Sequence, residues 1–178
     1  MKEADVLEPN NFYAASKASQ ISLCQAFARI YNKPLIIMRL FNVYGYYEEK
    51  GRLVRRVIES VLQRKPILLA RGNEARDFIF TEDVVDALML AGKKTDVFGE
   101  IFNVGSGRQT TILQLARKII ALAKTRVPIK LGAYKGRTWD STHWKADMEK
   151  TEALLGWRAQ YSLDEGLAKT IDWYKKQQ

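Results

Sequence analysis

The sequence is poor in cysteine and histidine: its 178 residues include one cysteine, Cys24, and one histidine, His143. A single cysteine excludes an internal disulfide framework and a zinc site built on cysteines. A single histidine excludes a metal site built on several histidines, so we expect no bound metal. This scarcity of cysteine is compatible with a reducing compartment, and we expect a cytoplasmic location.

Long apolar runs are missing as well. No stretch approaches the roughly 18 apolar residues of a membrane-spanning helix, so we expect no membrane partner. The first five residues, MKEAD, are rich in charge and no apolar run follows them. We therefore expect no signal peptide.

The rest of the composition is that of a folded domain. Apolar residues make up 47%, charged residues 28% and aromatic residues 11%, which argues against disorder. The length suits one domain, or one domain with a subdomain, and is enough to bury a core. The net charge of +9 favours an anionic partner, and it leaves three candidates: nucleic acid, an anionic membrane surface and a small phosphorylated ligand.

Helical periodicity alternates with short apolar runs along the chain. Helices are predicted over 13–31, 54–62, 82–92, 112–124, 147–155 and 163–176, and strands over 35–41, 67–69, 76–80, 100–104 and 128–131. Three prolines, Pro34, Pro66 and Pro128, each stand between a helix and the following strand. This alternation indicates an α/β architecture with a parallel component.

Several helix ends carry their own signals. Thr81 is expected to cap the helix that follows it. Two capping boxes are expected, Thr111 with Gln114 and Ser162 with Glu165. Gly156 is expected to end the helix over 147–155.

The first group that can carry chemistry is Tyr13-Ala14-Ala15-Ser16-Lys17. Tyr13 and Lys17 lie four residues apart in a helix, so both project from one face. An ammonium group beside a phenol favours the phenolate, which can act as a general base or acid on a hydroxyl or carbonyl group. The alternative is a surface pair without a catalytic role.

Three further positions are candidates for ligand contacts. Asn42 follows a predicted buried strand, and ligands of open α/β sheets bind at the carboxyl ends of strands; the alternative is a plain turn. Arg76 beside an extended apolar segment suits bidentate contact with phosphate, or a surface ion pair with Asp77 or a glutamate. Arg137, in a long polar loop, is either an anion contact or a solvated residue.

Five motifs follow one another in a defined order. They are Tyr-x-x-x-Lys, then Arg-Leu-Phe-Asn-Val-Tyr-Gly, then Arg-Asp-Phe-Ile-Phe-Thr-Glu-Asp-Val-Val-Asp-Ala, then Phe-Asn-Val-Gly-Ser-Gly, and finally Arg-x-x-Asp with Leu-Leu-Gly-Trp after it. This order and spacing resemble the extended short-chain dehydrogenase/reductase family, in its NAD-dependent nucleotide-sugar epimerase/dehydratase branch. The resemblance runs from about residue 7 to residue 174.

The resemblance implies roles around the cofactor. Tyr13 matches the family's catalytic tyrosine, which takes or returns the proton of a sugar hydroxyl. Lys17 matches the lysine that bonds the nicotinamide ribose of NAD and favours the phenolate. Phe41, Asn42 and Val43 match the segment that lines the nicotinamide and the substrate diphosphate, with Asn42 as the polar contact.

The resemblance also implies a site for a nucleotide-diphosphate sugar. Leu53 and Val54 match positions that pack the nucleotide base or sugar. Arg76 and Arg137 match the two arginines that hold the diphosphate and nucleoside. Asp140 matches an acidic residue beside the second arginine that often reaches the nucleotide ribose.

The sequence also departs from the family. A Gly-x-x-Gly-x-x-Gly turn, which receives the NAD pyrophosphate at a helix N-terminus, is not found, and Gly105-Ser106-Gly107 is interpreted as a turn. The Ser or Thr that normally precedes the tyrosine is also missing. The chain is therefore expected to be a truncated form: the C-terminal part of a Rossmann-type doubly wound parallel sheet plus a small mixed α/β substrate-binding subdomain.

The domain boundary is expected near residue 45. Residues 1–45 would be the end of the NAD-binding domain, and residues 46–178 the substrate-binding subdomain, with some segments returning to the sheet. The helix over 13–31 and one edge of the strand over 35–41 would then expose apolar surface. We expect a homo-oligomer or a complementing chain to cover it.

Three hypotheses about function remain. The first is an NAD-dependent epimerase or dehydratase that oxidises the sugar transiently. The second is a catalytically inactive fragment that binds a nucleotide sugar or complements another chain. The third is a basic nucleic-acid-binding domain, suggested by the charge alone, because no nucleic-acid-binding signature accompanies it; we expect no nucleic-acid partner.

Overall fold

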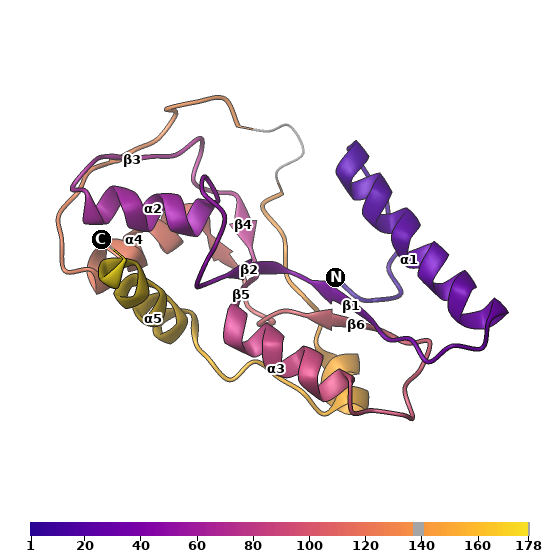
Figure 1. Ribbon diagram of the computed structural model, residues 1–178. Helices are drawn as coiled ribbons and strands as arrows, with labels where there is room; N and C mark the ends of the chain where they lie inside the picture. The colour runs from indigo at the N-terminus through magenta and orange to yellow at the C-terminus, as the bar shows by residue number, and fades with distance from the viewer. Residues whose placement is uncertain (137–140, 178) are drawn as a thin grey trace.

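The computed structural model describes residues 1–136 and 141–177 as an α/β fold. Figure 1 shows its elements in chain order. The elements are α1 (Phe12–Ile30), β1 (Ile37–Leu40), β2 (Asn42–Tyr44), α2 (Leu53–Leu62), β3 (Ile67–Leu68), β4 (Ala75–Arg76), β5 (Phe78–Phe80), α3 (Thr81–Ala91), β6 (Ile101–Val104), β7 (Thr110–Thr111), α4 (Ile112–Leu122), β8 (Ile129–Lys130), the π-helical turn η1 (Thr151–Leu155) and α5 (Leu163–Lys176).

The strands pair two by two, and most of the pairs are parallel. β1 pairs with β6, β2 with β5, and β3 with β8, each in parallel, whereas β4 and β7 are antiparallel. The paired parallel strands are separated in sequence by helices, as parallel pairing requires a crossover. This arrangement confirms the α/β prediction with its parallel component.

Local signals at the helix ends are mostly confirmed. Both capping boxes form, at Thr111 for α4 and at Ser162 for α5. Gly156 follows η1 in the left-handed conformation, with φ at 73°. The cap at Thr81 was a wrong expectation: α3 begins at Thr81 itself, and the extended residue Phe80 precedes it without a side-chain cap. The helix expected over 147–155 is shorter and ends in the π-helical turn.

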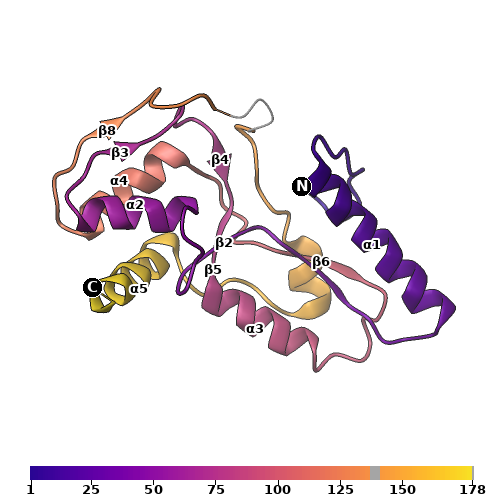
Figure 2. The same ribbon diagram turned by 45° about the horizontal axis from the view of Figure 1, so that its top comes forward.

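Two groups of buried apolar side chains form the core. One joins α2, α4 and α5, with Ile58, Ile119 and Leu167 fully enclosed. The other lies between the β1–β6 pair, α3 and the segment around η1, and includes Phe102 and Trp157. A fully buried side chain of this size contributes about 1.5–3 kcal/mol to stability. Figure 2 shows α2, α4 and α5 on one side of β2 and β6, and α1 on the other.

Helix α1 stands apart from both groups in Figures 1 and 2. It has no buried residue, and several of its apolar side chains are exposed: Phe12 is 96%, Leu23 69% and Ile30 74% accessible. The expected exposed apolar surface is therefore present on α1. In the part of the chain that the structure describes, no helix is long and apolar enough to span a membrane.

Candidate functional site

The first part of the candidate site is the N-terminal turn of α1. The Asn11 side chain caps the helix by accepting the backbone N–H of Ala14 at 2.9 Å. One turn further, Lys17 Nζ lies 5.7 Å from the centroid of the Tyr13 ring and donates to Gln20 Oε1 at 3.2 Å. Tyr13 is 74% exposed. The structure thus places the phenol and the ammonium group together on an accessible helix face, as their spacing predicts.

The second part is the junction between β1 and β2. The strand expected over 35–41 breaks at Phe41, whose backbone N–H donates to Val104 O at 2.9 Å. The next residue, Asn42, turns to the other strand pair and donates its N–H to Asp77 O at 3.0 Å. Phe41, Asn42 and Val43 are all half-buried. Within the described residues the Asn42 side-chain amide has no hydrogen-bond partner, so both its donor and its acceptor can meet a ligand.

The predicted contacts at the start of α2 differ in accessibility. Leu53 is half-buried and packs at the margin of the core. Val54 is only 1% exposed and belongs to the core itself. A contact between Val54 and a ligand stays a prediction, and the fold shows that the Val54 side chain packs inside.

Arg76 lies on β4, where two backbone carbonyls accept hydrogen bonds from its guanidinium group. Its Nη1 donates to Ala75 O at 2.7 Å and to Ser141 O at 3.1 Å. Its Cζ lies 5.6 Å from the centroid of the Trp144 ring, within the range of a cation–π contact. Arg76 is therefore oriented by the segment 141–144. The other predicted ligand contacts on the nucleoside side, Arg137 and Asp140, lie outside the described residues.

Asp77, the next residue, has a role that the sequence does not reveal. Its buried carboxylate accepts four hydrogen bonds: Oδ1 from the backbone N–H and the hydroxyl of Ser106, both at 2.7 Å, and Oδ2 from the N–H groups of Gly107 and Ala146, both at 3.0 Å. The alternative of a surface ion pair between Arg76 and Asp77 does not predict these four hydrogen bonds. The alternation of side chains along a strand was the available signal, because it turns Asp77 away from the face of Arg76.

The Asp77 carboxylate joins three segments that are distant in the sequence. Burial raises the pKa of the Asp77 carboxyl, and the hydrogen bonds from Ser106, Ala146 and Gly107 offset part of that rise. Space is tight around it: a Cβ atom on Gly105 would lie 2.7 Å from the Cβ of Ala146 and 3.0 Å from Asp77 Oδ2. Glycine at 105 therefore allows the turn to close on the carboxylate.

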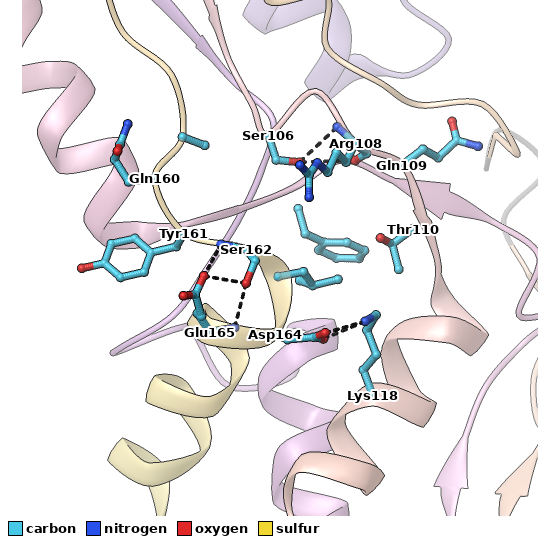
Figure 3. Close-up of a pocket in the computed structure, with 13 residues that line it drawn as sticks. Ser106, Arg108, Gln109, Thr110, Lys118, Gln160, Tyr161, Ser162, Asp164 and Glu165 are labelled. Atoms are coloured by element: carbon cyan, nitrogen blue, oxygen red, sulfur yellow. Dashed lines mark hydrogen bonds and ion pairs between the residues drawn. The ribbon is translucent and has the colours of Figure 1, made fainter.

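A separate hollow of about 430 Å³ lies between the 106–110 turn, α4 and the N-terminus of α5. Figure 3 shows the ion pair between Lys118 and Asp164 at its wall, at 2.7 Å. None of the predicted site residues that the structure describes lines it. In the described part of the chain, no group of three or more acidic, histidine or cysteine side chains could hold a metal ion.

Comparison with known proteins identifies the family. Residues 1–105 match the NAD dependent epimerase/dehydratase family. The chain is 32% identical over 183 residues to the dTDP-glucose 4,6-dehydratase of Haemophilus influenzae. This alignment covers 97% of the chain and 54% of that protein. It is also 32% identical over 181 residues to the human dTDP-D-glucose 4,6-dehydratase, and that alignment covers 98% of the chain and 51% of the human protein.

Solved structures give the same result. MoeE5 in complex with UDP-glucuronic acid and NAD superimposes with a TM-score of 0.93 at 28% identity, over 100% of this chain and 60% of MoeE5. The dTDP-glucose 4,6-dehydratase of Bacillus anthracis in complex with NAD superimposes with a TM-score of 0.89 at 27% identity, over 98% of this chain and 55% of that protein. The chain spans about half the length of the curated relatives it matches. With its Rossmann-type architecture and its match over more than half of the sequence, the chain belongs to the NAD-dependent epimerase/dehydratase family, within the extended short-chain dehydrogenases/reductases.

Proposed function

We propose that this chain supplies the proton-transfer pair and part of the substrate site of an NAD-dependent enzyme that acts on a nucleoside-diphosphate sugar. The observation that carries the proposal is the Tyr13–Lys17 pair, with its phenol and ammonium group adjacent and accessible. Tyr13 takes the proton from a sugar hydroxyl and returns it later. The Lys17 ammonium group places a positive charge beside the phenol ring of Tyr13.

The residues present fit the nicotinamide-ribose end of NAD. The fit rests on the donor chemistry: the exposed ammonium group of Lys17 can bond ribose hydroxyls, and the amide of Asn42, which has no partner among the described residues, offers both a donor and an acceptor. Phe41 and Val43 would supply apolar contacts beside it. Bound beside these residues, NAD would supply the reversible hydride transfer at the sugar carbon. Tyr13, Lys17 and Asn42 orient the sugar and move its hydroxyl proton.

We assign the diphosphate to Arg76, whose guanidinium group is fixed by Ser141 and Trp144. A guanidinium fork matches phosphate oxygens, and part of the net charge of +9 serves this purpose. Arg137 and Asp140 would complete the nucleoside side, and Leu53 would face the base or sugar, with Val54 packed behind it in the core. We propose residues 1–45 as part of the NAD-binding domain and residues 46–178 as the substrate-binding part, with segments that return to the sheet.

The relatives narrow the substrate class. The sequence relatives described above are named dTDP-glucose 4,6-dehydratases, and MoeE5 binds UDP-glucuronic acid. We therefore propose a dTDP- or UDP-hexose as the substrate, and dehydration, a lyase reaction, ahead of epimerisation. We also propose a cytoplasmic enzyme in which a second copy of the chain, or a complementing chain, covers α1.

Calorimetric titration with dTDP-glucose and UDP-glucose, with and without NAD, tests the assignment. We expect Arg76→Ala to weaken sugar-nucleotide binding at least tenfold, because charge-assisted hydrogen bonds to the diphosphate are lost. Tyr13→Phe should retain binding and lose turnover wherever turnover is measurable. The matched control is Arg117→Ala, which removes an exposed arginine on α4. Equal binding by Arg76→Ala and Arg117→Ala would contradict the proposal.

A further inference from the structure

Gln109 makes two hydrogen bonds to one short segment of the chain. Its Nε2 donates to Thr142 O at 2.8 Å, and its Oε1 accepts the backbone N–H of Trp144 at 2.9 Å. A single side-chain amide therefore holds both sides of residue 143. Figure 3 shows the Gln109 side chain extending away from the Lys118–Asp164 ion pair, so it is not engaged with that wall of the hollow.

The segment that Gln109 holds is the one that orients Arg76. Ser141 O accepts both the backbone N–H of Ala75 at 3.1 Å and Nη1 of Arg76 at 3.1 Å. The Trp144 ring lies 5.6 Å from Cζ of Arg76. The backbone groups bound by Gln109 belong to Thr142, next to the Ser141 carbonyl, and to Trp144 itself.

We propose that Gln109 is a positioning residue for the Arg76 guanidinium group, and that it raises affinity for the diphosphate of a sugar nucleotide without touching the ligand. This inference rests on the proposed function, in which Arg76 binds that diphosphate. Holding Thr142 and Trp144 fixes the carbonyl and the ring that orient the guanidinium group. A preorganised arginine loses less side-chain freedom when the ligand binds.

The amide is the side-chain group that these two partners require. Thr142 offers an acceptor and Trp144 a donor, and only a group with both functions satisfies both. A glutamate at position 109 could accept from Trp144, but in its ionised form it would face the Thr142 carbonyl without a proton. A protonated glutamate restores both hydrogen bonds.

The test uses the whole chain with UDP-glucose as the probe, titrated by calorimetry. Gln109→Ala should weaken binding about fivefold, which corresponds to the loss of roughly 1 kcal/mol for partly solvated hydrogen bonds. Gln63→Ala, at an exposed glutamine, is the matched control and should bind as the unchanged chain does. Because Gln109 is exposed, its replacement should leave the fold intact, which circular dichroism checks.

Two further variants separate positioning from a general structural effect. In an Arg76→Lys background, Gln109→Ala should change the affinity by less than about twofold, because a lysine lacks the fork that Ser141 and Trp144 orient. Gln109→Glu should regain affinity relative to the unchanged chain as the pH falls toward about 4.3, the ordinary pKa of a glutamate.

The outcomes are distinguishable. If UDP-glucose binds but Gln109→Ala leaves its affinity unchanged, or if the loss persists in full with Arg76→Lys, the positioning role is overturned and the proposed function stands. If Gln109→Glu shows no recovery at lower pH, the donor to Thr142 does not matter and the inference is overturned. If the unchanged chain does not bind UDP-glucose, or Arg76→Ala binds it equally well, the proposed function fails and this inference fails with it.

Discussion

The substitution Asp77→Asn should destabilise the chain more than any comparable surface change. The Asp77 carboxylate accepts four hydrogen bonds, two on each oxygen, and is fully buried. An amide replaces one oxygen by an NH₂ group, which then faces donors. If Nδ2 replaces Oδ2, the N–H groups of Gly107 and Ala146 both lose their acceptor. An unsatisfied buried donor costs about 1–3 kcal/mol, so we expect a loss of roughly 2–4 kcal/mol in the free energy of unfolding.

Urea denaturation followed by circular dichroism at neutral pH measures this loss. With a slope of about 2 kcal/mol per M, the midpoint should fall by roughly 1–2 M. Asp96→Asn makes the same chemical change at an exposed position and should shift stability by less than about 0.5 kcal/mol. If Asp77→Asn behaves like Asp96→Asn, the four hydrogen bonds do not contribute as argued, and the account of the turn at Ser106 is refuted.

Three other predictions follow from particular contacts. Burial raises the pKa of Glu48 to about 7, so its contribution to the free energy of unfolding is full below about pH 4.5 and is lost as the pH rises through 7. Glu48→Gln should therefore reduce the fall in the free energy of unfolding between pH 4.5 and neutral pH by roughly 1–2 kcal/mol. Identical pH profiles for the variant and the unchanged chain would count against this prediction. In Gly166→Ala the added methyl group would meet the Tyr44 hydroxyl and the Phe80 ring. Despite the better helix propensity of alanine, we expect the free energy of unfolding, measured by thermal unfolding, to fall by about 1–3 kcal/mol. An unchanged melting temperature would exclude this overpacking. The double variant Leu23→Lys/Ile30→Lys places charges on the exposed apolar surface of α1, so it should lower self-association, measured by sedimentation, and binding of an apolar dye, measured by fluorescence. If neither changes, the α1 surface does not mediate association.

The features that the sequence predicts are those that depend on neighbours in the chain. The boxes at Thr111 and Ser162 form because each cap needs only a partner three residues away. The Tyr13–Lys17 geometry follows from one helical turn in the same way. Thr81 fails as a cap because Phe80, already extended, starts the helix one residue earlier.

Contacts between distant segments were beyond prediction. Asp77 meets Ser106 and Ala146, which lie 29 and 69 residues along the chain. Arg76 meets Ser141 over a separation of 65 residues. The periodicity of apolar residues says which faces are buried, but it does not say which polar groups face one another across the core. Identifying Gln109 needed the same long-range information.

The detached position of α1 divides the proposed site into two regions of different local stability. Arg76 and Asp77 are tied to segments far apart in the sequence, so their hydrogen bonds break only when much of the fold opens, and the amide proton of Ala146 should exchange with solvent at nearly the rate of global unfolding. Helix α1 has no buried residue, so its amide protons should exchange through local fraying. The proposed diphosphate contact is therefore built into the cooperative part of the molecule, whereas the proposed proton-transfer pair gains its rigidity only when something packs against α1.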